Sequence, residues 1–141
     1  IGKYCAYQER CHQEVRDKLY DYGLTTDHVE FLIYDLIQHD FLNEERYAVA
    51  YCRGKFKHKN WGRRRIVSEL KKRKISDYCI NKGLSEIEEL DYLKTIRKLL
   101  DKKFLKHSSE SDYIKHNAAA KYVIGKGFES DLVWGEIRNM K

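Results

Sequence analysis

The sequence predicts an all-α protein, built as an elongated, curved array of three tandem three-helix repeats of which the last copy is incomplete. Three observations predict this: proline is absent, apolar residues recur at helical spacing, and one pattern of residues occurs three times. Helices exclude proline because its ring removes a backbone hydrogen bond and clashes with the preceding turn. With 42% hydrophobic residues, the 141-residue chain has enough apolar material for the core of one domain.

The first predicted helices begin at capping residues. Asp27, with Glu30 three residues later, resembles a capping box that would open a helix ending near Gln38. Asn43, followed by two glutamates, is a favourable N-cap for a second helix, which we expect to run to about Lys57. A short connection separates the two helices.

Further helices follow in the second half of the chain. Gly62 ends a short turn before a basic helix, and Ser85 with Glu86 begins a long amphipathic helix. The long helix has a predicted apolar stripe of Ile87, Leu90, Leu93, Ile96 and Leu100. Two helices near residues 112–126 and 130–140 complete the chain.

A set of four apolar positions recurs after 51 and again after 53 residues. The positions are Val15, Leu19, Leu24 and Val29, then Ile66, Leu70, Ile75 and Ile80, and then Ala119, Val123, Phe128 and Val133. We place the repeats at about residues 1–58, 59–107 and 108–141, within one domain that spans residues 1–141. Such units stack in a line because none of them can close a core alone.

Capping residues recur together with the apolar positions. Gly23 and Gly127 occupy a helix C-cap position, where glycine enters the left-handed region without strain, and Lys74 occupies it in the middle copy. The N-cap position that follows contains Thr25-Thr26, Ser76-Asp77 and Glu129-Ser130. Matching caps support a true repeat of helix, turn and helix.

Positive charge is concentrated in one segment. The chain carries a net charge of +6, but residues 53–74 contain eleven Lys or Arg and one acid, Glu69, so this segment carries +10 and the rest −4. We expect one positive surface that faces phosphates or acidic side chains. The alternative, a solvated helix face, does not need such a concentration of charge.

The predicted basic helix presents its cations on one face. With Ile66 on the buried side, Arg65 and Lys72 project almost opposite to it, and Arg64 and Lys71 flank them. The two pairs, each seven residues apart, suit an extended partner better than a small anion. The predicted binding residues are these four with Lys55, Lys57, Lys59 and Arg73.

Two roles are open for Trp61, which precedes the basic helix. Its ring could stack on a base or an arginine, or it could pack the chain entry against the core. Tyr47, Tyr51 and Phe56 lie at helical spacing, and we expect them in the core.

No set of residues indicates catalysis. Cys5, Cys11 and His12 lack zinc-site spacing, and His39-Asp40 has no second histidine or carboxylate set to complete a metallophosphatase-like site. The chain also lacks a phosphate-binding loop of the GxxxxGK[ST] type. We therefore predict no enzymatic activity, no catalytic residue, no metal and no cofactor.

The expected location is the cytoplasm. No run of apolar residues approaches the roughly 20 that cross a bilayer, so we expect no membrane partner. The four cysteines are scattered, which favours reduced, partly buried thiols over a disulfide framework.

Two stretches in order, DFLNEERYAVAYCR at 40–53 and NWGRRRIVSELKKRKI at 60–75, resemble the RecX family of recombination regulators. A weaker similarity lies in KYVIGKGFESDLVWGEI at 121–137. Three residues depart from the family pattern: Asn60 and Lys74 stand where glycine is usual, and Arg63 where proline is usual.

This resemblance implies a modular protein of three three-helix repeats that binds the RecA recombinase, chiefly as its filament on single-stranded DNA. We expect a monomer, because a repeat array buries its core internally. The protein would inhibit filament growth, ATP hydrolysis and strand exchange in DNA repair and the SOS response. The alternative is a stand-alone basic helical-repeat protein that binds DNA or RNA.

Overall fold

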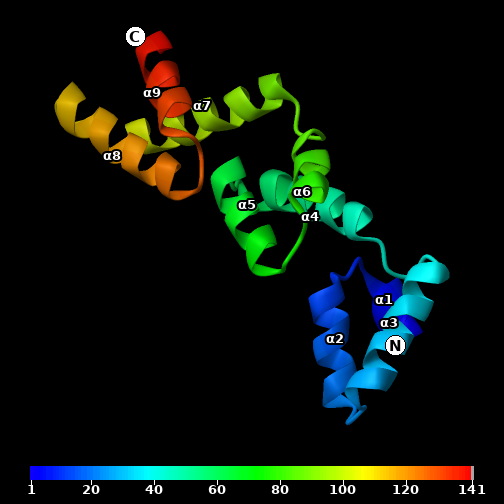
Figure 1. Cartoon of the computed structure of the whole chain (residues 1–141). Coiled ribbons are helices and arrows are strands. Elements are labelled where there is room, and N and C mark those ends of the chain that lie inside the picture. The colour runs from blue at the N-terminus through cyan, green and yellow to red at the C-terminus, as the bar shows by residue number, and fades with distance from the viewer. Residues whose placement is uncertain (141) are drawn as a thin grey trace.

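The computed structural model describes residues 1–140, which form nine α-helices and, within that range, no strand (Figure 1). The helices are α1 (Gly2–Tyr7), α2 (His12–Asp21), α3 (Thr26–Gln38), α4 (Glu44–Lys59), α5 (Arg63–Lys72), α6 (Asp77–Leu84), α7 (Glu89–Lys106), α8 (Asp112–Gly125) and α9 (Ser130–Asn139). The predicted all-α fold is confirmed. The array is elongated, with the two ends of the chain at opposite ends of the molecule. Among the described residues, no helix is both long and apolar enough to cross a bilayer.

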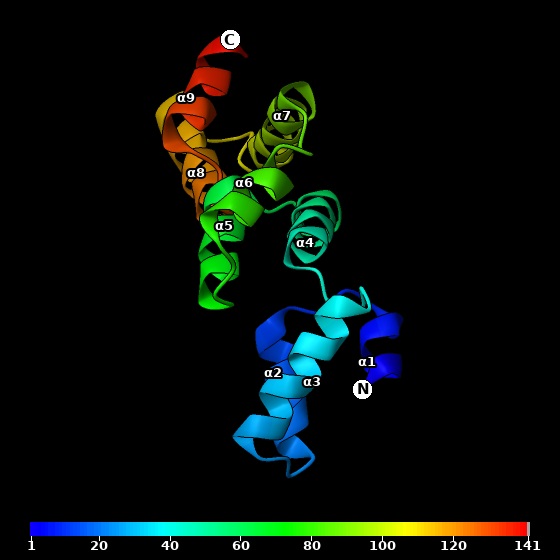
Figure 2. The same ribbon diagram turned by 45° about the vertical axis from the view of Figure 1, so that its right-hand side comes forward.

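The helices pack in groups of three along the chain (Figure 2). Helix α2 packs on α3, α4 packs on α5 and α6, and α7 packs on α8 and α9. We name these groups the N-terminal unit (1–42), the central unit (43–84) and the C-terminal unit (85–140). We propose boundaries near residues 43 and 85 in place of 58 and 107. The recurring pattern lies on the second and third helices of each unit. It therefore did not indicate to which unit the first helices, α4 and α7, belong.

The recurring positions form the cores of these units. Eleven of the twelve are buried, and only Leu24 is partly exposed. The three predicted C-cap residues all have a positive φ, which is 83° at Gly23, 60° at Lys74 and 103° at Gly127. Thr25, Ser76 and Glu129 are the N-caps that follow, as predicted. The helix–turn–helix repeat is therefore confirmed.

Lys74→Gly is expected to stabilise the protein by about 0.5–1 kcal/mol. A left-handed conformation costs an L-residue about 1–2 kcal/mol, of which the greater freedom of glycine in the unfolded chain offsets a part. The measurement is the free energy of unfolding from a denaturant titration. Lys102→Gly, at an exposed position inside α7, is the matched control and should destabilise by about 1 kcal/mol. Destabilisation by both substitutions would contradict this account of Lys74.

The predicted capping box at Asp27 is wrong. The N-cap of α3 is Thr25, two residues earlier, and the Glu30 carboxylate accepts hydrogen bonds from the Arg16 guanidinium of α2, the shorter of them 2.8 Å long. This pairing lowers the pKa of Glu30. Glu30 thus binds a side chain of another helix and does not cap its own helix. The predicted end of α3 at Gln38 is confirmed.

The long helix begins later than predicted. Ser85 forms the C-cap of α6, and α7 starts at Glu89 after a short turn. Leu90 is therefore 71% exposed, whereas Tyr92 is fully buried. In contrast, the side chain of Asn43 accepts a hydrogen bond from the Arg46 amide at 2.9 Å, so the predicted cap of α4 is confirmed.

The units are joined in two different ways. The central and C-terminal units share one apolar core, which also includes the fully buried Cys11 of the N-terminal unit. The other buried residues of the N-terminal unit form a second core built around Val15, Leu19 and Ile33. A polar contact joins the N-terminal unit to α4: Arg46 binds the Glu9 carboxylate at 2.7 Å and the Asp40 carbonyl at 2.9 Å. The N-terminal unit thus has its own main core and meets the other two units through Cys11 and this polar contact.

Two glycines, Gly62 and Gly127, allow a close backbone contact between the central and C-terminal units. The Gly62 amide donates to the Lys126 carbonyl at 2.9 Å, and the Arg64 amide donates to the Gly127 carbonyl at 3.0 Å. A Cβ on Gly62 would lie 2.2 Å from the Gly127 carbonyl carbon. The turn before α5 and the turn after α8 therefore interlock backbone to backbone, and this contact fixes the placement of α5.

All four cysteines are free and buried, in agreement with the predicted absence of a disulfide framework. Burial raises the pKa of Cys52 to about 12, so this thiol stays protonated at neutral pH.

Candidate partner interface

Helix α5 begins with three consecutive arginines and no acid in its first turn. Cations are unfavourable at this end because the helix dipole is positive there. Arg63 is neutralised, since its guanidinium binds Glu129 at 2.8 Å and also Glu89. Arg64 and Arg65 have no carboxylate within ion-pairing distance among residues 1–140. A local conflict without compensation is typical of a functional surface.

Arg63 joins units rather than facing solvent. Its guanidinium carbon lies 3.8 Å from the centre of the Tyr92 ring, and its amide donates to the Tyr92 hydroxyl at 2.9 Å. The Tyr92 hydroxyl donates in turn to Glu129, and burial raises the pKa of Tyr92. This role could not be predicted from the sequence, because the partners come from distant α7 and the turn before α9.

The predicted orientation of α5 is confirmed. Ile66 and Leu70 are fully buried, while Arg64, Arg65, Lys71 and Lys72 are all exposed. We call these four residues the α5 cations. Of the four, only Lys72 pairs with a carboxylate within the described part of the chain, namely Glu69 at 3.2 Å. The α5 cations are therefore available to an anionic partner.

Cations and aromatic rings alternate beside α5. The Arg65 guanidinium carbon lies 4.1 Å from the centre of the Trp61 ring, and the Lys55 ammonium lies 4.9 Å from that centre. Tyr51 meets Trp61 edge-on, and the Arg73 guanidinium lies 5.1 Å from the Tyr51 ring centre. This ladder holds Lys55, Arg65 and Arg73 in place, which reduces the entropy lost when they bind a partner.

Both roles considered for Trp61 are visible in part. The ring is half-buried and packs against the shared core, and it also stacks with an arginine of its own chain. Among the other aromatics, Tyr47 is buried, and Phe56 and Tyr51 pack against the core from its edge. The prediction of core positions is thus confirmed for Tyr47 and met in part for the other two.

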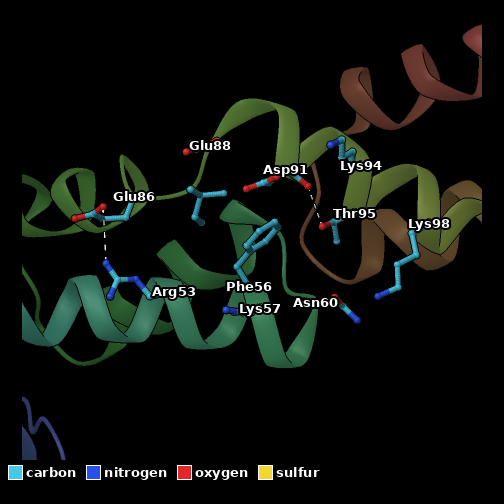
Figure 3. Close-up of a pocket in the computed structure, with 11 residues that line it drawn as sticks. Arg53, Phe56, Lys57, Asn60, Glu86, Glu88, Asp91, Lys94, Thr95 and Lys98 are labelled. Atoms are coloured by element: carbon cyan, nitrogen blue, oxygen red, sulfur yellow. Dashed lines mark hydrogen bonds and ion pairs between the residues drawn. The ribbon is translucent and has the colours of Figure 1, made fainter.

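The remaining predicted residues lie further from the ladder. Lys57 lines a groove of about 400 Å³ between α4 and α7, together with Phe56, Lys94 and Lys98 (Figure 3). Arg53 and Glu86 form an ion pair of 3.9 Å along the same groove. Lys59 is exposed at the end of α4. The structure therefore places Lys57 in a groove of mixed charge that none of the α5 cations lines.

For the nucleic-acid binding that the α5 cations predict, Glu69→Gln is expected to raise the affinity for single-stranded DNA severalfold at low salt. The Glu69 carboxylate binds Lys72 and Arg73, each at 3.2 Å, and these hydrogen bonds lower its pKa. Removing the negative charge frees cations, so the slope of log affinity against log salt should steepen by about one. Fluorescence anisotropy over a salt series measures this slope. Glu45→Gln, at an exposed position with no ion pair in residues 1–140, is the control, and an equal effect there would contradict the prediction.

Known proteins have the same arrangement of three-helix units. A family profile described as the RecX second three-helix domain matches residues 43–84, which are the central unit. The crystal structure of RecX from Lactobacillus salivarius superposes with a TM-score of 0.89 at 27% identity, over 97% of this chain and 89% of that one. These similarities support the RecX family for this chain.

Curated RecX proteins are similar along nearly the whole chain. The regulatory protein RecX of Clostridium perfringens strain 13 is 27% identical over 133 residues, which are 93% of this chain and 62% of that protein. The regulatory protein RecX of Streptococcus uberis is 28% identical over 92% of this chain and 50% of its own length. The chain thus spans about half to two thirds of these two relatives.

The structure bears on all three departures from the RecX pattern. Asn60 and Lys74, where glycine is usual, have φ values of 54° and 60°. Both positions need the left-handed region, which glycine enters most easily and asparagine next. Arg63 replaces a proline at the first position of α5, where proline is favoured, but its amide can bind Tyr92 as proline could not.

Proposed function

We propose that this RecX-family protein inhibits the RecA recombinase. It would bind the RecA filament on single-stranded DNA and limit filament growth, ATP hydrolysis and strand exchange during DNA repair and the SOS response. The observation that carries the proposal is the set of α5 cations, exposed on one helix and largely unpaired within the described chain. The similarity to regulatory proteins named RecX supports the filament among the possible anionic partners.

The shape of the molecule supports contact with a filament. An elongated array can touch several subunits of a repeating partner at once, and repeated weak contacts then add up to tight binding. The α5 cations would face phosphates or acidic protein surface, with Lys55, Lys59 and Arg73 beside them and Lys57 acting from the α4–α7 groove. The proposed action needs no catalytic group, because occupancy of the filament is sufficient. We propose that the protein acts as a cytoplasmic monomer.

A second function is favoured by the charge of the central unit alone. Residues 43–84 contain thirteen Lys or Arg and four acids, a net of +9. A stand-alone DNA- or RNA-binding protein would use the same surface, and its affinity would fall steeply with salt. Such a protein would bind bare strands at least as well as recombinase-coated strands.

The test is ATP hydrolysis by the cognate recombinase on single-stranded DNA, titrated with this protein. Inhibition below one protein per recombinase subunit is expected, because a filament regulator need not saturate the filament. A parallel titration measures the affinity for bare and for recombinase-coated strands. Unchanged hydrolysis at saturating protein, or equal affinity for the two kinds of strand, would reject the first function in favour of the second.

A further inference from the structure

Helix α3 has apolar residues on two opposite faces. Val29 and Ile33 are buried in the core of the N-terminal unit. Phe31 and Tyr34 project from the other side of the helix and are 66% and 62% exposed. A surface helix needs only one apolar face, so a second one indicates an interaction site.

Two more apolar side chains are partly exposed near the end of the helix. Ile37, on the flank of α3, is 39% exposed, and Phe41, in the turn before α4, is 42% exposed. We call Phe31, Tyr34, Ile37 and Phe41 the α3 aromatic face. Two large aromatic side chains at its centre can supply most of the energy of a protein contact.

The surroundings of the α3 aromatic face are acidic. The N-terminal unit contains eight Asp or Glu and four Lys or Arg, a net of −4, against +9 in the central unit. Asp27 lies one turn before Phe31 on the same side of α3, and Asp35 directly follows Tyr34, and both carboxylates are exposed. Nucleic-acid phosphates would be repelled from this face, whereas a basic protein surface would be attracted.

We infer that the α3 aromatic face docks a basic, partly apolar protein surface on the recombinase, while the α5 cations meet phosphate. This inference rests on the proposed function, and it divides the contacts with protein from those with DNA. Lys or Arg side chains of the partner would stack on Phe31 and Tyr34 and pair with Asp27 and Asp35. A second copy of this chain fits less well, because its own cations would already be engaged with the filament.

The separate core of the N-terminal unit suits this division. The unit meets α4 through Arg46 and its partners Glu9 and Asp40, and it contributes only Cys11 to the core of the other two units. The two surfaces can therefore be changed independently. Exposed side chains on α3 can be replaced without disturbing the core beneath α5.

The test compares Phe31→Ser/Tyr34→Ser with the wild type by anisotropy on bare and on recombinase-coated single-stranded DNA, with a non-hydrolysable ATP analogue. The double variant is expected to bind coated strands at least about tenfold more weakly and bare strands unchanged. Leu105→Ser/Tyr113→Ser is the matched control, since both side chains are 78% exposed in the C-terminal unit, and it should bind as the wild type does. Thermal unfolding followed by circular dichroism checks that both variants fold.

Each other outcome has a distinct meaning. Unchanged binding of the double variant to coated strands, while the wild type binds them well, would overturn this inference and leave the proposed function standing. Equal losses on bare and coated strands would also overturn it, because the face would then contact DNA. A wild-type dimer in sedimentation velocity that the double variant loses, with filament binding intact, would assign the face to self-association instead. Failure of the wild type to prefer coated strands would remove the proposed function itself.

Discussion

Gly62→Ala is expected to destabilise the protein by about 3 kcal/mol or more. The added Cβ would lie 2.2 Å from the Gly127 carbonyl carbon and 2.3 Å from the Phe128 amide nitrogen, and both of these are backbone atoms. A flexible side chain could move aside, but here two turns would have to separate, together with the hydrogen bonds between them. Denaturant titration gives the loss of unfolding free energy directly.

Gly54→Ala is the matched control for this prediction. Gly54 lies inside α4, and an added Cβ there would meet no atom within 4 Å. Alanine is the better helix former, so this substitution should stabilise by about 0.5–1 kcal/mol. The two identical substitutions should thus have opposite signs. A loss of less than about 1 kcal/mol at Gly62 would show that the interlock of the two turns is not rigid.

Reversal of the α5 cations is expected to abolish most binding to single-stranded DNA. Arg64, Arg65, Lys71 and Lys72, each replaced by Glu, turn four attractive contacts with phosphates into repulsive ones. At low salt the affinity should fall by about a hundredfold or more. The slope of log affinity against log salt should become shallower by about three. The same variant should no longer inhibit ATP hydrolysis by the recombinase. The core beneath α5 should survive, since all four side chains are exposed.

A control with the same change in net charge separates local contacts from the overall charge of the molecule. Lys102, Lys106, Lys121 and Arg138, all exposed in the C-terminal unit, are replaced by Glu in this variant. Its affinity should change much less than that of the α5 variant. Equal losses in the two variants would mean that net charge, and not the α5 surface, drives binding.

Local features of the sequence were sufficient to predict the helical class, most helix ends and the repeat. The left-handed conformations of Gly23, Lys74 and Gly127 were also predictable, because each residue ends a helix and such an end is a local feature. The orientation of α5 also followed from periodicity, since the buried side of a helix is determined by its own apolar residues. The start of α7 was predicted too early, because Ser85 resembles an N-cap but completes the preceding helix.

Tertiary contacts decided the features that make the candidate surface specific. The pairing of Arg63 could not be read from its neighbours, since its partner Glu129 lies 66 positions away. The contact of Gly62 with Gly127 and the separation of Lys57 from the α5 cations depend likewise on which distant turns and helices meet. Periodicity and capping therefore determined what each segment of this chain forms. Only the packing of segments far apart in sequence determined which charges are neutralised and which remain free to bind, because neutralisation requires a partner in space and not in sequence.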